Sequence, residues 1–235
     1  MNKYKSLTIK CNDTIITSTD SVNYLGCNLE QTLSGQQIAA KLIKKANNKI
    51  KFLFRQAKHL NSHCKKLLAS ALVQCHLDYA CCAWYFGLST TYKKKLQVVQ
   101  NKLVRFVLGY KSRGHVGVNE ICSLNWLPVP MRVEQLALNH MYKIANNTAP
   151  LYLCNEFLKT ADCHGHNTRN SENSFSIPKV KSNGINSFKF QAAKIWNDIP
   201  NTIKSAKSIT IFKPLAKKYL SNKIIGLDKQ AYVYY

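Results

Sequence analysis

The sequence predicts a mainly α-helical protein with a helical bundle, a small N-terminal β-hairpin or sheet, and a second helical region. Apolar residues recur every three or four positions over most of the chain after residue 34, whereas they alternate with polar residues only near the start. The 235 residues are 46% hydrophobic, which is enough to bury a genuine core. We expect a β-rich part at 1–32, a basic three-helix bundle at 33–112 and a mainly helical part at 113–235, with a long loop at about 159–187.

The first 30 residues contain short alternating runs that are typical of β-strands. Ser6–Lys10 alternates, Cys11–Asp13 supplies a turn, and Thr14–Thr17 is the answering strand. A third apolar piece follows at Val22–Gly26. Because so short a hairpin and strand are marginal alone, we expect them to pack on something else.

A basic helix follows from Ser34. Its apolar residues are spaced three, four, three, four and three apart, which predicts a seam that packs on other helices. They are Ile43, Ala46, Ile50, Leu53, Ala57 and Leu60. The opposite side of the wheel carries six cations and no carboxylate: Lys41, Lys44, Lys45, Lys51, Arg55 and Lys58. Solvated faces usually mix both signs, so this face is the strongest candidate for nucleic-acid binding, with a merely solvated face as the alternative.

Two more helices complete the predicted bundle. Asn61 or Ser62 can cap the second, which is expected to run to Trp84 before Gly87 interrupts the pattern. The third has an apolar face formed by Leu96, Val99, Leu103, Phe106 and Tyr110. Its basic residues are further candidates for contacting a nucleic-acid backbone: Lys93, Lys94, Lys95, Lys102 and Arg105.

The remainder of the chain predicts further helices separated by loops. A loop at Tyr110–Gly117 precedes helices at Val118–Leu124, from Met131 to Ile144, at Pro150–Leu158, at Ser187–Asn197 and at Ser208–Leu220. Residues 159–187 are polar with little periodicity, which predicts a loop with one extended segment at Ser176–Lys179. The tail after Ser221 is expected to fray.

The charge balance is strongly positive. Lys and Arg number 34 against 11 Asp and Glu, a formal net charge of +23. This imbalance favours a polyanionic partner, most often nucleic acid and less often an anionic membrane surface. A basic protein without a specific partner is the alternative.

Cysteine use favours a reducing compartment. The nine cysteines are odd in number, and several lie within apolar helical patterns. No secretory signal opens the chain, and no apolar run approaches the length of a membrane span. We expect a soluble, intracellular protein, either nuclear or cytoplasmic.

The sequence offers little material for catalysis. No two carboxylates adjoin or stand two apart, and there is neither a Gly-rich phosphate loop nor a G-x-S-x-G motif. Cys75, His76 and Asp78 are too close on one predicted helix to align as a nucleophilic relay. Trp84 and Trp196, like Trp126, lie in apolar patterns and are expected to be core anchors rather than platforms for bases.

One stretch offers possible zinc ligands. They are Cys154, Cys163, His164 and His166. Their spacing matches no standard zinc finger, because a second close cysteine pair or a His-x₃₋₅-His is missing. We therefore expect loop residues here, and zinc binding stays an alternative.

An ordered set of short motifs spans nearly the whole chain from Val22 to Leu220. The set is Tyr24-Leu25-Gly26, Leu77-Asp78-Tyr79, Trp84, Leu96-Gln97-Val98-Val99-Gln100-Asn101-Lys102, Arg105, Leu124-Asn125-Trp126-Leu127-Pro128-Val129, Arg132, Thr168-Arg169, Ser187-Phe188, Trp196-Asn197, Ile199-Pro200 and Phe212-Lys213. In this order it resembles the C-terminal part of a LINE reverse transcriptase, and more narrowly the jockey-type non-LTR retrotransposon group.

The resemblance implies a polymerase fragment. Residues 1–32 would be the edge of the palm, with Tyr24, Leu25 and Gly26 near the primer grip. Residues 33–112 would be the thumb, which holds a template–primer duplex by its backbone, and residues 113–235 would be a C-terminal extension. The family's aromatic-Ala-Asp-Asp motif does not occur in this sequence. We therefore expect no polymerase activity and no cofactor from this chain alone, since Mg²⁺ would belong to the missing palm.

The partners implied are RNA, DNA or an RNA–DNA hybrid, and the remainder of a polymerase. Two alternatives remain. The first is a basic helical module that binds an acidic protein or an anionic membrane surface. The second is an independent Cys/His zinc protein.

Overall fold

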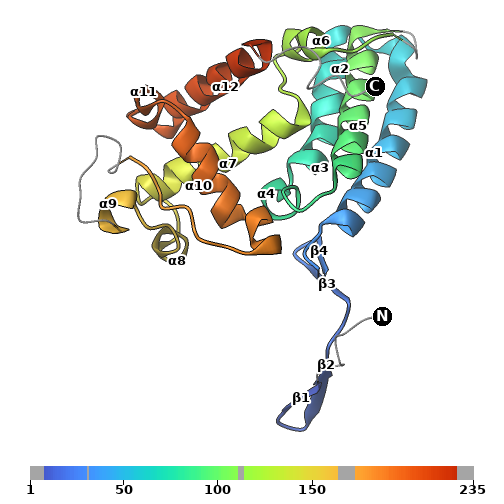
Figure 1. The fold of residues 1–235 in the computed structure, drawn as a ribbon. Coiled ribbons are helices and arrows are strands. Elements are labelled where there is room, and N and C mark those ends of the chain that lie inside the picture. Colours follow the sequence, from blue (N-terminus) through green and yellow to red (C-terminus); the bar gives the residue numbers. More distant parts are fainter. Residues whose placement is uncertain (1–7, 31, 111–113, 164–172, 227–235) are drawn as a thin grey trace.

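The computed structural model describes residues 8–30, 32–110, 114–163 and 173–226. The fold is mainly helical with two small β-hairpins at its N-terminal end, as the sequence predicts. Figure 1 shows the hairpins projecting from one end of a helical body. Among the described residues, no helix is both long enough and apolar enough to cross a bilayer.

The N-terminal part contains two separate antiparallel pairs. Strand β1 (Thr8–Cys11) pairs with β2 (Thr14–Thr17), where the sequence predicts a hairpin, and all eight residues are exposed. Strand β3 (Ser21–Tyr24) pairs with β4 (Cys27–Glu30). The single strand predicted at Val22–Gly26 is therefore half of a second hairpin. Leu25 and Gly26 form its two-residue turn with φ of 48° and 79°, the left-handed pair that matches the twist of a tight hairpin.

Helix α1 (Gln36–Gln56) forms where the apolar seam predicts it, and a 3₁₀ turn at Ala57–His59 ends it. Ala46, Ile50 and Leu53 are buried, whereas Ile43, Ala57 and Leu60 are partly buried against the same core. The carboxylate of Glu30, at the end of β4, accepts the Gln37 backbone N–H and the Ser34 hydroxyl. Glu30 therefore joins the second hairpin to the start of α1, where a negative charge suits the helix dipole.

The second predicted helix is continuous from Ser62 to Asp78, with a π-helical turn inside it, and then breaks at Tyr79 and Ala80. Helix α2 (Ser62–Ala69) is capped by Asn61, whose Oδ1 accepts the Cys64 N–H at 2.8 Å. A π-helical turn at Ser70–Gln74 and helix α3 (Cys75–Asp78) follow. The chain then turns at Ala80 (φ 48°) before helix α4 (Cys81–Trp84).

The prediction of one continuous helix to Trp84 is therefore wrong. The Trp84 indole N–H donates to the Tyr79 carbonyl at 3.1 Å. This side-chain bond satisfies a carbonyl at the break, so the helix can end there without leaving that group unpaired. Helix α5 (Thr90–Leu108) then runs beside α1, as Figure 1 shows.

The C-terminal half is built from α6 (Val118–Ser123), α7 (Val129–Ala145), α8 (Leu151–Asn155), α9 (Thr160–Cys163), a 3₁₀ turn at Ser182–Asn186, α10 (Phe188–Asp198), α11 (Asn201–Lys204) and α12 (Ile209–Gly226). Helix α7 begins at Val129 rather than Met131, because Pro130 is tolerated in the first turn of a helix. Helix α12 continues past the predicted frayed tail at Ser221, and its Ile224 is buried.

The stretch predicted as a long loop is partly anchored to the core. Besides α9, it contains an antiparallel bridge between Lys159 and Phe175. The Ser176 N–H donates to the Leu158 carbonyl. The paired, extended backbone therefore reaches only the first residue of the predicted Ser176–Lys179 segment. Phe175 is buried against Trp196. This aromatic anchor, which the weak periodicity did not reveal, fixes part of residues 159–187.

Two hydrophobic cores lie within the described residues. The first joins α1–α5 and continues past residue 112 into Ile121 of α6 and Val133 of α7. The second joins α7 with α10 and α12 around Trp196 and Phe212. Trp84 and Trp196 are buried and Trp126 packs against the first core, which confirms the expectation of core anchors. Helix α7 contributes to both cores and connects the two halves.

Candidate nucleic-acid interface

Carboxylates are almost absent around the bundle. Between Glu30 and Glu120 the sequence has Lys or Arg at sixteen positions and a single acidic residue, Asp78. Asp78 is already engaged by Arg132 of α7, whose Nη2 lies 2.8 Å from its Oδ2. The bundle therefore has no acidic side chain left to neutralise its other cations.

The six cations predicted on α1 are all exposed. They are Lys41, Lys44, Lys45, Lys51, Arg55 and Lys58. Within the described part of the chain, none of the six forms an ion pair. Steps of seven and four place Lys44, Lys51 and Arg55 on one side of α1, and Lys58 follows in the 3₁₀ turn at its end; we call these four residues the α1 cation face. The other two lie further round the helix.

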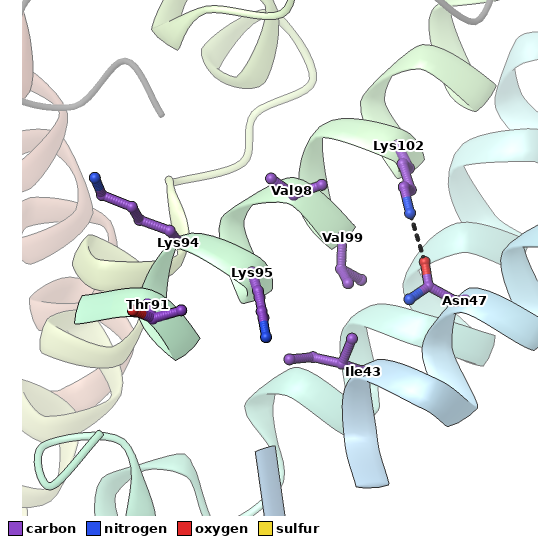
Figure 2. Close-up of a pocket in the computed structure, with 8 residues that line it drawn as sticks. All are labelled: Ile43, Asn47, Thr91, Lys94, Lys95, Val98, Val99 and Lys102. Carbon is purple, nitrogen blue, oxygen red and sulfur yellow. Dashed lines mark hydrogen bonds between the residues drawn. The ribbon is translucent and has the colours of Figure 1, made fainter. Parts of the chain in front are cut away.

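The α1 cation face borders a groove between α1 and α5. Two adjoining hollows of about 320 and 780 Å³ share Asn47 and Lys102 in their walls. Figure 2 shows the first hollow, with the Lys102 ammonium donating to the Asn47 Oδ1 at 2.7 Å across the two helices. Apolar side chains form the floor of this α1–α5 groove: Ile43, Ile50, Phe54, Val98 and Val99.

Cations stand on both walls of the α1–α5 groove. Lys51 and Arg55 line it from α1, whereas Lys94, Lys95 and Lys102 line it from α5. In Figure 2 the Lys95 side chain points towards Ile43, across the hollow, and Lys94 points away. Five of the eleven cations predicted as binding residues thus meet at one feature of the surface.

The other two predicted cations of α5, Lys93 and Arg105, contact groups of the protein itself. The Arg105 Nε donates to the Gly114 carbonyl at 2.7 Å. The Lys93 ammonium lies 5.3 Å from the centre of the Tyr85 ring, and burial lowers its pKa. Both side chains are also partly buried, so they are poorer candidates for binding than the eight predicted cations that are exposed.

Lys93 also lines a cleft of about 730 Å³ between the two halves of the protein. This cleft mixes both signs of charge. Its wall includes the ion pair between Lys223 and Asp198, and the carboxyl of Glu134. A cleft with neutralised cations is a weaker site for a polyanion than the α1–α5 groove.

The predicted primer-grip motif lies at the tip of the second hairpin. Tyr24 and Leu25 are exposed, and Gly26 completes the turn. The Tyr79 hydroxyl donates to the Leu25 carbonyl at 2.6 Å. The motif is therefore held against the break between α3 and α4.

The possible zinc ligands are only partly described. His164 and His166 lie outside the described residues. Cys163 is exposed in α9, and the Cys154 thiol donates to the Ala149 carbonyl. Among the described residues, no three His, Cys, Asp or Glu side chains gather in a way that could hold a metal ion.

The three residues considered as a nucleophilic relay have separate partners. The Cys75 thiol donates to the Ala71 carbonyl, and the His76 Nε2 lies 2.8 Å from the Lys49 ammonium. Asp78 pairs with Arg132. Their different partners agree with the expectation that these side chains point in different directions.

Several motifs behind the reverse-transcriptase resemblance contact one another. The Gln97 Oε1 accepts the Val129 N–H at 2.9 Å, and the Gln100 amide donates to the Leu127 carbonyl at 2.8 Å. Asp78 and Arg132 form the ion pair described above. These residues fix how α3, α5 and α7 pack against one another.

Sequence reasoning missed the apolar floor and Asn47. A signal was present, because Asn47 stands three residues after Lys44 and four before Lys51, and Phe54 three after Lys51. Which helix lies beside that face could not be read from spacing alone.

Comparison of the chain with protein-family models, with curated proteins and with solved structures gives no match in any of the three.

Proposed function

We propose that this chain binds nucleic acid by its sugar–phosphate backbone along the α1 cation face and the α1–α5 groove. The observation that carries the proposal is the exposed set of cations along α1 and the turn after it, none of which forms an ion pair within the described residues, in a bundle whose one carboxylate already has a partner. Mutual repulsion among such cations is relieved when phosphates bind. The resemblance of residues 33–112 to a reverse-transcriptase thumb supports the same role.

Binding of this kind depends on charge and not on base sequence. Lysine and arginine side chains that contact phosphates release condensed counterions, so affinity falls as salt rises. A protein that makes six to ten phosphate contacts loses roughly 10³-fold or more in affinity between 50 and 200 mM salt. Specific recognition of base edges would need donors and acceptors fixed in a groove of the nucleic acid.

We also propose that the chain does not itself synthesise DNA. The sequence contains no adjacent aspartates, so it lacks the pair of carboxylates that would hold two Mg²⁺ ions. Its role would be to hold a template and primer for a polymerase palm, in the nucleus or cytoplasm. A primer-extension assay checks this point, and extension by the isolated chain would contradict it.

The binding proposal is tested with two variants that lose equal charge. The first replaces Lys44, Lys51, Arg55 and Lys58 by Gln; the control replaces four exposed lysines outside the bundle, Lys179, Lys207, Lys213 and Lys218. Fluorescence anisotropy with a labelled oligonucleotide between 50 and 200 mM salt gives the affinity and its salt slope. We expect the first variant to bind at least tenfold more weakly at 100 mM salt, with a slope shallower by about 3. The control should stay within threefold of the wild type.

Two results would contradict the proposal. One is an affinity that does not change with salt, and the other is an equal loss in both variants, which would mean that only net charge matters. Competition with anionic phosphatidylserine vesicles distinguishes a membrane-surface role. Vesicles that displace the oligonucleotide at equal charge concentration would favour that alternative.

A further inference from the structure

The α1–α5 groove has the shape and lining of a site for one strand of nucleic acid. We infer that it binds single-stranded segments in preference to a duplex, an inference that rests on the proposed function. Its support comes from three properties of the groove, namely its width, its apolar floor and the placement of cations on both walls.

Width is the first property. Helices α1 and α5 pack directly against each other, and axes of packed helices lie about 8–10 Å apart. The major groove of a duplex alone is about 12 Å wide, so a duplex can only rest across the two helices. The floor residues Ile43 and Val98 are partly exposed along the line where the helices meet, so one strand can reach them.

The apolar floor is the second property. A duplex stacks its bases inside and presents phosphates and sugars, which gain nothing from Ile50 or Val98. A single strand exposes its base faces, which stack on aromatic and apolar side chains whatever their sequence. Phe54 is the aromatic residue of the floor, and 40% of it is exposed.

The ring of Phe54 is also held in place. Its centroid lies 5.5 Å from that of Phe106 in an edge-to-face arrangement, and Phe106 is buried in the first core. A ring fixed in advance loses little conformational freedom when a base stacks on it. Phe54 is thus the residue best placed to contact a base.

Charge placement is the third property. Lys51 and Arg55 of α1 line the second hollow together with Lys102 of α5, so a strand there has cations on both sides, and Lys95 extends the α5 side into the first hollow. The lined part of α1 runs from Ile43 to Arg55, about 18 Å of helix. At a spacing of about 3.4 Å per nucleotide this length accommodates about five nucleotides.

The test compares one 12-nucleotide mixed-sequence DNA, alone and as a blunt duplex with its complement, at 100 mM salt. We expect the full chain to bind the single strand at least fivefold more tightly. Phe54→Leu keeps apolar volume but removes the ring, and should weaken single-strand binding at least fivefold with little effect on the duplex. Phe54→Tyr should bind as the wild type does.

Phe52→Leu is the matched control. Phe52 is 50% exposed on the same helix, but two positions away it faces a different direction and does not line the groove. The Phe52→Leu substitution should change the affinity for the single strand less than twofold. Circular dichroism of each variant confirms that the helical content is unchanged.

The possible failures are distinguishable. Equal or tighter duplex binding, with no effect of Phe54→Leu, overturns the single-strand inference, while salt-dependent binding through α1 keeps the proposed function. If the chain binds neither the single strand nor the duplex, both the single-strand inference and the proposed function are overturned. An acidic amphipathic peptide rich in Glu and Leu that displaces the single strand at equal concentration would assign the groove to a protein partner instead.

Discussion

Arg132 of α7 holds Asp78 of α3 through two nitrogens, with Nη2 at 2.8 Å from Oδ2 and Nε at 3.2 Å from both carboxylate oxygens. Its remaining Nη1 donates to Gln135 at 2.8 Å. The planar guanidinium therefore satisfies three acceptors at the point where the bundle meets the central helix. In a chain with so few carboxylates, this pair is a fixed structural contact, and Asp78 is not available to repel a polyanion.

Loss of the guanidinium should destabilise the contact between α3 and α7. We expect Arg132→Ala to lower the free energy of unfolding by about 1–2 kcal/mol, because the pair is only partly screened by solvent. Arg132→Lys should recover less than half of this, since an ammonium cannot bridge both oxygens. Urea denaturation measures both values. Lys189→Ala, which removes a more exposed pair with Glu156, is the control and should cost under ~0.5 kcal/mol. Equal losses in Arg132→Ala and the control would contradict the structural role.

A buried amide network between α5 and α7 should be equally sensitive. Gln97 accepts the Val129 N–H, the first of α7, and its own amide donates to Gln100 and Asn101. Gln97→Leu leaves these groups unpaired in a buried site, so we expect a loss of about 2–4 kcal/mol. Gln97→Glu keeps the acceptor for Val129 but places a charge there, and should also destabilise. Thermal unfolding of both variants, with Gln56→Leu on the exposed end of α1 as control, checks the network. A Gln97→Leu variant as stable as the wild type would contradict it.

The regular helices could be predicted because their information is local. The spacing of Ile43, Ala46, Ile50 and Leu53 alone predicts which side of α1 is buried and which carries cations. The break at Ala80 could not be predicted in this way. It depends on the Trp84 indole reaching the Tyr79 carbonyl, a contact that no residue spacing reveals.

The candidate site shows the same division between local and tertiary information. Its cations are visible in the sequence, but the α1–α5 groove exists only because α5 lies beside the Asn47 side of α1. Arg105 and Lys93 look like binding residues in the sequence, and only their partners Gly114 and Tyr85 show that they serve the fold. A basic residue can therefore be counted from sequence, but its availability depends on its neighbours.

Close backbone contact between the start of α1 and the end of α4 gives a further prediction. A Cβ on Gly87 would lie 2.8 Å from the Leu33 carbonyl oxygen, and one on Gly35 would overlap the Trp84 carbonyl. Gly35 also has φ of 68°, so an alanine there meets both steric overlap and backbone strain. We expect losses in the free energy of unfolding of about 1–3 kcal/mol for Gly87→Ala and more for Gly35→Ala.

Gly109→Ala separates the two effects. Gly109 has a similar φ of 71°, but nothing lies within 4 Å of its would-be Cβ. Its substitution should therefore cost only the backbone term, about 1 kcal/mol. Chemical denaturation gives the three values. If Gly35→Ala cost no more than Gly109→Ala, the close approach to Trp84 would not be a constraint on the fold.

Glu134 predicts a pH-dependent change in stability. Burial raises the pKa of its carboxyl above the ordinary value near 4.5, and the neighbouring Asp198 adds to this rise while Lys223 opposes it. The folded state therefore holds the proton more tightly than the unfolded state. The stability that Glu134 contributes is greatest below pH 4.5 and falls as the pH rises through the folded pKa. Glu134→Gln removes this loss, so its stability relative to the wild type should increase from pH 4 to pH 7. Urea unfolding of both proteins at half-unit pH steps measures the difference, which cancels the contribution of other titrating groups. A difference that stays constant with pH, or that decreases, would show that the Glu134 carboxylate is not penalised by its surroundings.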